Sequence, residues 1–202
     1  MDRSDRRLLA GGVAGPVAFA AAWLWGSTSA EGYSMVSDPI SRLAAVGATT
    51  RPVMTTGLLT FAAGVGAYAW GARTTLPPRA LAAAAVTAAS SVGIAATPLD
   101  GPLGGAPHAV AAGLAYSSLL ALVAAGAPAL AEVERGRRRI PTVVSNVVAG
   151  VSAACLAVSA FGPEGTTGLF QRAGLSLGHA WIAASAVVIH RSRVSDDRKP
   201  SG

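Results

Sequence analysis

The chain has 202 residues, of which 51% are hydrophobic and 13% are charged, and its 16 basic residues outnumber its 10 acidic residues. The mean hydropathy of +0.48 and the long stretches without charge exclude an ordinary soluble domain, whose helices would carry polar faces. We therefore expect whole helices that face lipid or lie buried in a bundle.

Six apolar segments follow one another along the chain, over residues 8–26, 52–71, 80–97, 107–131, 140–161 and 168–190. Each is about as long as the roughly 20 residues that are needed to cross a bilayer as a helix. No connection between them is long enough to fold alone. We therefore predict an all-α fold, a polytopic bundle of six transmembrane helices in a single domain over residues 1–191.

The two ends of the chain allow more than one interpretation. The first segment could be a secretory signal peptide, since Arg6 and Arg7 precede it and small polar residues follow it. Its 19 residues exceed the roughly 7–15 of a signal-peptide core. Trp23 and Trp25 also stand where an aromatic belt anchors a span, so we expect a retained helix. The polar tail over 192–202 is expected to be disordered.

The basic residues divide unevenly between the two sides that six spans create. Only Arg42, Arg51 and Arg172 fall on one side, while the other 13 of the 16 lie in the leader, the second and fourth connections and the tail. The positive-inside rule then places both termini in the cytoplasm, with the chain in a plasma (inner) membrane. The high basic content therefore reflects topology, and membrane lipids rather than nucleic acid are the expected partners.

Small residues recur four positions apart in several segments, a spacing that lets helix backbones approach closely in membranes. They are Gly11 and Gly15, Gly174 and Gly178, and the series Gly105, Ala109 and Gly113. The lone Cys155 lies inside the fifth segment, which excludes a disulfide within the chain and indicates a packing role.

The longest segment on the sparsely charged side, residues 27–51, contains an Asp38-Pro39 pair. Aspartate followed by proline is typical of a helix N-cap with proline at the first helical position. Ile40, Leu43 and Ala44 would then give a short helix one apolar face, which lies along the membrane surface. Asp38 is therefore either a cap or an acidic group that contacts a substrate, and Ser41 is a second candidate on the same segment.

Asp100 and His108 flank the turn before the fourth span and lie eight residues apart. Asp100-Gly101 between prolines is typical of a tight turn, so a purely structural role is the first alternative. His108 stands just after the start of a helix, where a neutral imidazole suits a metal ligand or a general base. The pair predicts ligands or a base at the mouth of the bundle.

The sixth span carries three polar residues at helical spacings of four and three, namely Arg172, Ser176 and His179. His179 would lie about 10 Å deeper than Arg172, at 1.5 Å per residue. An ionisable side chain at that depth should face the protein interior or a wet cavity. We expect Arg172 to hold an anionic group, and His179 to be a ligand, a proton carrier or a hydrogen-bond partner of Ser152 or Ser159.

Three motifs on this side are similar to those of a bacterial membrane family catalogued as domain of unknown function 998. They are Tyr33-Ser34 through Ile40-Ser41-Arg42-Leu43, Pro98-Leu99-Asp100 with His108, and Gly168-Leu169-Phe170-Gln171-Arg172. The resemblance covers nearly the whole chain and implies a six-span fold without a particular activity. In that family an acidic residue often follows the motif serine, whereas this chain has Arg42 there, so any such role is either absent here or falls to Asp38.

Three classes of function agree with these observations, and the sequence does not decide whether the protein is an enzyme. The first is a metal-dependent intramembrane hydrolase of lipid-like substrates, with Asp100, His108 and His179 as catalytic residues and ligands of a possible zinc ion. Its substrate would contact Asp38, Ser41, Arg172 and Ser176. The second is a proton- or solute-coupled carrier or a receptor for a small-molecule or lipid ligand. The third is a non-catalytic helper subunit. All three assume an outer-facing polar pocket.

Overall fold

The computed structural model of the chain describes residues 3–103, 105–133 and 139–197. These residues form helices joined by turns and contain no strand, so the predicted all-α fold is confirmed. The elements are α1 (Arg3–Leu9), α2 (Gly11–Ser29), the 3-10 helix η1 (Ile40–Ala44), α3 (Arg51–Gly71), α4 (Pro78–Ala96), α5 (Gly105–Val133), α6 (Arg139–Phe161) and α7 (Thr167–Asp197).

Within these residues, six helical segments are long and apolar enough to cross a membrane, as the sequence predicts. The last one extends further than expected, because α7 continues through residues 192–197, which were predicted to be disordered. That prediction is wrong for this part of the tail. Arg193 is buried there and donates a hydrogen bond of 2.8 Å to the carbonyl oxygen of Gly71, which holds the end of α7 against α3. Residues 198–202 lie outside the described residues.

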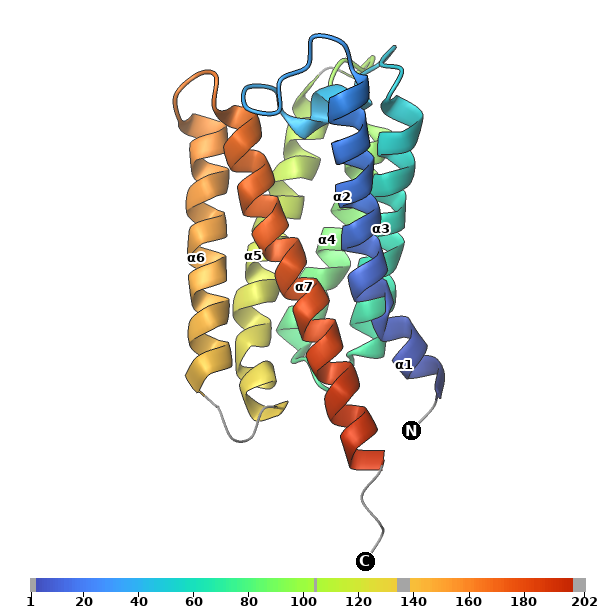
Figure 1. Cartoon of the computed structure of the whole chain (residues 1–202), viewed down its shortest axis with the longest axis vertical. Helices are drawn as coiled ribbons and strands as arrows, with labels where there is room; N and C mark the ends of the chain where they lie inside the picture. Colours follow the sequence, from blue (N-terminus) through green and yellow to red (C-terminus); the bar gives the residue numbers. More distant parts are fainter. Residues whose placement is uncertain (1–2, 104, 134–138, 198–202) are drawn as a thin grey trace, which may run out of the picture.

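Consecutive helices pack against one another, and α7 closes the bundle by crossing it diagonally between α6 and α2 (Figure 1). Both ends of the chain lie at the same end of the bundle in this view, as an even number of spans requires. We call this the terminal end. The connection that contains η1 lies at the opposite end, which we call the η1 end. η1 contacts α2, α3 and α7, so the connection folds back onto the bundle.

Glycines bring α2 and α3 into direct backbone contact. A Cβ atom on Gly64 would lie 2.6 Å from the carbonyl oxygen of Gly11 and 2.8 Å from the Cα atom of Gly15. The tandem Gly11-Gly12 follows a break in the helix at Ala10, which separates α1 from α2, in keeping with the tendency of glycine pairs to bend helices. The predicted close contact at Gly11 and Gly15 is therefore confirmed.

The other two glycine pairs differ from each other. Gly174 packs against Ser152 of α6 and Gly178 against Leu119 of α5, as their spacing predicts. No atom of the described residues lies within 4 Å of a Cβ placed on Gly113, and a Cβ on Gly105 would lie 3.9 Å from the carbonyl oxygen of Leu99, an ordinary contact distance. The close backbone approach predicted for the Gly105–Gly113 series is therefore wrong at both glycines.

Hydroxyl groups link the helices inside the apolar core. The Tyr68 hydroxyl of α3 and the Ser185 hydroxyl of α7 lie 2.7 Å apart, and both residues are buried. The Trp181 indole of α7 donates to the Ser145 hydroxyl of α6 at 2.8 Å. Hydrogen bonds of this kind stabilise helix association where lipid removes the hydrophobic driving force, so they help α7 to hold its crossing position.

The contact between α2 and α3 leads to a first prediction, on Gly64→Ala. Alanine favours a helix over glycine by up to about 1 kcal/mol, but the new Cβ would overlap backbone atoms, and overpacking costs about 1–3 kcal/mol. We expect a lower melting temperature in detergent, measured by tryptophan fluorescence. Gly66→Ala is the matched control, because a Cβ there meets nothing within 4 Å, and it should be neutral or slightly stabilising. Equal melting temperatures for the two variants would contradict the prediction.

Candidate functional site

A cavity lies inside the bundle near the η1 end, and η1 forms part of its cover. It offers about 70 Å³ to the centres of water-sized molecules, within about 770 Å³ of space that includes open solvent. Residues from α2, α3, α4, α5 and α7 line it, together with η1 and the turn after α4. This number of contributing elements is typical of a ligand pocket between the helices of a bundle.

The wall of this cavity is mostly apolar, and no Asp, Glu, Lys or Arg is among the described residues that line it. The polar lining residues are Ser41, Thr87, Ser91, His108, Tyr116, Gln171 and His179. Of the residues that the sequence nominates for a site, Ser41, His108 and His179 therefore meet here, while Asp38, Asp100, Arg172 and Ser176 do not. The predicted polar pocket is in fact an apolar cavity with a few hydrogen-bonding points.

His179 lies on the deep wall of the cavity and is only 8% exposed. Its ring contacts the rings of Phe61 and Phe19, with centroid distances of 4.4 Å and 5.5 Å. The alternative hydrogen bond to α6 is wrong, because Ser159 instead donates to the carbonyl oxygen of Thr167 at 3.0 Å. The Ser152 hydroxyl has no hydrogen-bond partner within the described part of the chain. The imidazole of His179 is thus packed between aromatic rings beside the cavity.

His108 enters the cavity wall from the first turns of α5, and its position is set by one hydrogen bond. Its Nδ1 atom lies 2.7 Å from the carbonyl oxygen of Thr97, at the end of α4. A carbonyl oxygen only accepts, so Nδ1 carries the hydrogen and a neutral ring keeps Nε2 as an acceptor. His108 therefore offers an acceptor to a ligand that can donate a hydrogen bond.

Asp100 is exposed in the turn after α4 and does not line the cavity, so the structure does not bring it together with His108 and His179. Among the residues that the structure describes, no three His, Cys, Asp or Glu side chains are grouped so that they could hold a metal ion. A zinc site takes at least three protein ligands. The residues present therefore do not fit the zinc site that the sequence suggests, and no catalytic step through a metal follows from them.

Ser176 is exposed, although its spacing from Arg172 and His179 predicts a shared face. The side of α7 that meets the cavity consists of Gln171, Leu175 and His179, each four residues after the last. Ser176 follows Leu175 directly and so lies about 100° around the helix from it. Spacing alone predicts which residues share one side of a helix. It does not predict which residues at the margin of that side are buried.

Gln171 ties three elements together at the rim of the cavity, and sequence reasoning assigned it no role. Its Oε1 atom accepts from the backbone N–H of Ile40 in η1 at 2.7 Å, and its Nε2 atom donates to the Tyr116 hydroxyl of α5 at 2.6 Å. Gln171 is the only glutamine of the chain and directly precedes Arg172 in the third motif. This position in the motif was the one feature of the sequence that could have pointed to a role for Gln171.

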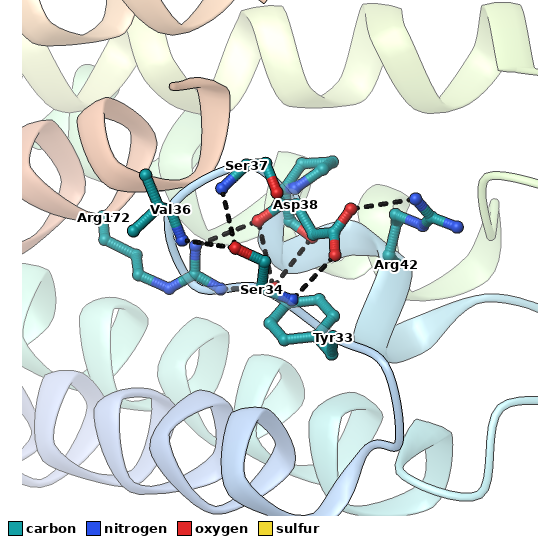
Figure 2. A network of polar contacts seen from close by, with 8 residues as sticks. Tyr33, Ser34, Val36, Ser37, Asp38, Arg42 and Arg172 are labelled. Carbon is teal, nitrogen blue, oxygen red and sulfur yellow. Dashed lines mark hydrogen bonds and ion pairs between the residues drawn. The ribbon is translucent and has the colours of Figure 1, made fainter. Parts of the chain in front are cut away.

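Arg172 holds the connection that covers the cavity (Figure 2). Its Nη1 atom donates to the carbonyl oxygens of Met35 and Asp38, at 2.8 Å and 3.0 Å, and its Nη2 atom donates to the Tyr33 hydroxyl. The guanidinium also lies 5.4 Å from the ring centroids of Trp23 and Tyr33, within the range of cation–π attraction. Both terminal nitrogens are thus occupied within the protein. Its Nε atom is buried without a hydrogen-bond partner among the described residues, and the binding of an anionic group by Arg172 stays a prediction.

The sequence context of Asp38 suggested the N-cap of the short helix, but Asp38 does not occupy that position. η1 begins at Ile40, with Pro39 at the cap position and no side-chain cap. The Asp38 carboxylate instead accepts from the backbone N–H of Ser34 at 2.8 Å and pairs with Arg42 at 2.9 Å (Figure 2). It therefore closes the turn before η1. The short helix buries Ile40 and Leu43 against the bundle, so the prediction that its apolar face lies along the membrane surface is wrong.

Close approach of α7 to this connection depends on Gly168. A Cβ atom there would lie 2.7 Å from the carbonyl oxygen of Met35, which is itself bound by Arg172. The backbone N–H of Leu169 donates to the carbonyl oxygen of Val36 at 2.9 Å. Burial raises the pKa of Tyr33 above its usual value, although Arg172 opposes this shift, so its hydroxyl stays a donor for the Pro39 carbonyl oxygen at 3.0 Å.

The three motifs that suggested a family in the sequence therefore meet at the η1 end. A family model described as protein of unknown function (DUF998) matches residues 13–188. The chain belongs to this family. Comparisons with curated proteins and with solved structures give no match. The DUF998 match contains the whole cavity wall and its cover, from Phe19 to His179.

The contacts of Arg172 in this DUF998 protein lead to a second prediction. Arg172→Gln removes charged hydrogen bonds to the partly buried carbonyl oxygens of Met35 and Asp38, and we expect it to lower the free energy of unfolding by about 3 kcal/mol. Backbone hydrogen exchange over residues 34–38 should become faster, as measured by mass spectrometry.

The matched control is Arg42→Gln on the same connection. The Arg42 side chain is 62% exposed and forms only a surface ion pair with Asp38, which contributes about 1 kcal/mol or less. Hydrogen exchange over 34–38 that responds equally to both substitutions would show that Arg172 does not hold the connection.

Proposed function

We propose that this DUF998 protein is a membrane receptor or carrier that binds a small uncharged amphiphile, such as a lipid-like alcohol, in the cavity under η1. The observation that carries the proposal is the charge-free wall of this cavity, with histidines set into an apolar lining. Ligand sites are commonly concave and apolar, with a few polar groups that orient the ligand.

The chemistry of the wall favours a neutral ligand over a charged one. A charge that enters an apolar site without a partner loses its hydration and is strongly disfavoured. The polar points of the wall are hydroxyls, a carboxamide that already makes two hydrogen bonds, and imidazoles. Because Nδ1 of His108 is bound to the Thr97 carbonyl oxygen, Nε2 of the neutral ring can accept a hydroxyl proton, and the apolar surface around Leu119 and Leu175 suits a hydrocarbon chain.

The charge distribution supports a side for this cavity. We infer that the η1 end faces the outside of a bacterial plasma membrane and that both termini are cytoplasmic. Of the 16 basic residues, 13 belong to the leader, the connections and the tail at the terminal end, and three belong to the η1 side. Cytoplasmic connections carry such an excess of Lys and Arg. A ligand would then enter from the external medium or from the outer leaflet.

The third prediction tests the ligand class with three molecules of equal chain length. Purified protein in detergent is melted with 1-decanol, decanoate or decylammonium. At about 100 times the dissociation constant, decanol should stabilise by about 2.7 kcal/mol and raise the melting temperature by at least about 5 °C. The two ions should shift it much less. Equal shifts from all three molecules would argue against an uncharged site.

Two variants of α5 separate binding in the cavity from effects on the detergent. Ala112→Trp fills the cavity, because Ala112 lines it, and should abolish the shift with decanol. Val110→Trp lies two residues away, where the side chain is 63% exposed, and should keep it. A decanol shift that survives Ala112→Trp would place the ligand elsewhere and overturn the proposal.

A further inference from the structure

Asn146 is exposed on α6, inside the segment Pro141–Phe161 that is long and apolar enough to cross a membrane. It lies seven residues after Arg139, where α6 begins, which corresponds to about 10 Å along the helix axis. The neighbouring Val143 and Val147 are 59% and 57% exposed, so this face of α6 meets lipid or another protein. An amide that is transferred from water to hydrocarbon without a partner costs about 2–7 kcal/mol.

The two carboxamide side chains of the sequence differ sharply in their surroundings. Gln171 is buried and makes two hydrogen bonds inside the bundle. For Asn146, no hydrogen bond to any of the described residues is found, and its side chain is exposed. α6 lies at the edge of the bundle (Figure 1), and α5 and α7 are the described helices with which it makes its main contacts.

The residues around Asn146 have the pattern of a membrane helix that pairs closely with another helix. Asn146-Val147, Gly150-Val151 and Ala154 follow at intervals of four, and all are exposed. Nothing in the described part of the chain lies within 4 Å of a Cβ placed on Gly150, so a hollow remains beside Asn146. Small residues four apart let two helices cross with their backbones in contact, and polar side chains hydrogen-bond across such crossings.

We propose that α6 forms the interface of a parallel homodimer, in which Asn146 hydrogen-bonds to Asn146 of the partner subunit. A carboxamide has both donors and an acceptor and is therefore complementary to itself. Every copy inserts into the membrane with the same topology, so a two-fold axis along the membrane normal brings both α6 helices together at the same depth. A second copy is thus the occupant that matches this amide in chemistry and in position.

The fourth prediction concerns association in liposomes. Single-molecule photobleaching of protein labelled at the C-terminus should show two-step traces for the unaltered chain. Asn146→Val should weaken dimerisation about tenfold, which corresponds to the 1–2 kcal/mol that such bonds contribute in model helices. Gly150→Leu, which fills the hollow, should weaken it as well. Val110→Leu, on an exposed part of α5, should leave it unchanged.

Cysteine cross-linking locates the interface independently, in a chain whose Cys155 is replaced by alanine. Gly150→Cys should form a disulfide between two copies in the membrane, whereas Val110→Cys should not. The melting temperature of Asn146→Val in detergent should match that of the unaltered chain, because the side chain contacts no other helix by hydrogen bonds. One-step traces for the unaltered chain, or dimers that survive both α6 substitutions, would overturn the proposal.

Discussion

One buried guanidinium organises the η1 end of this protein. Arg172 binds carbonyl oxygens of the connection after α2 and lies against the rings of Trp23 and Tyr33. Because the preceding residue, Gln171, bonds the backbone of Ile40 and the Tyr116 hydroxyl, a single turn of α7 fixes both the cover and the rim of the cavity. Loss of this turn's contacts would free the cover without breaking the bundle below it.

Charge and cavity are kept apart by this arrangement. Asp38 pairs with Arg42, and Arg172 binds backbone oxygens, so these ionised groups are engaged outside the cavity. Inside, the glycine contact of α2 with α3 brings Phe19 and Phe61 to a centroid distance of 5.8 Å, beside the His179 ring. The close approach of the helices therefore places aromatic rings beside the imidazole, and this part of the cavity wall is mostly apolar.

Sequence patterns predicted the six spans well, because hydropathy and length are local properties of each segment. They also predicted the glycine contact at Gly11 and an inward position for His179. They failed where two surroundings suit the same residue type. Asp38 suits a helix cap or a turn, Ser176 lies one position beyond the buried side of α7, and Asp100 stays exposed although it is close in sequence to His108.

The sequence by itself determined the family, the spans and the uneven distribution of basic residues, since each depends on composition and order along the chain. Only the tertiary structure decided which polar groups meet. Arg172 and Met35 are 137 positions apart in sequence, and no local pattern shows that the Met35 carbonyl oxygen accepts a hydrogen bond from the Arg172 guanidinium. The diagonal crossing of α7 brings the two residues together. Every residue has a carbonyl oxygen, so the sequence does not indicate which of them Arg172 binds, and only the fold decides it.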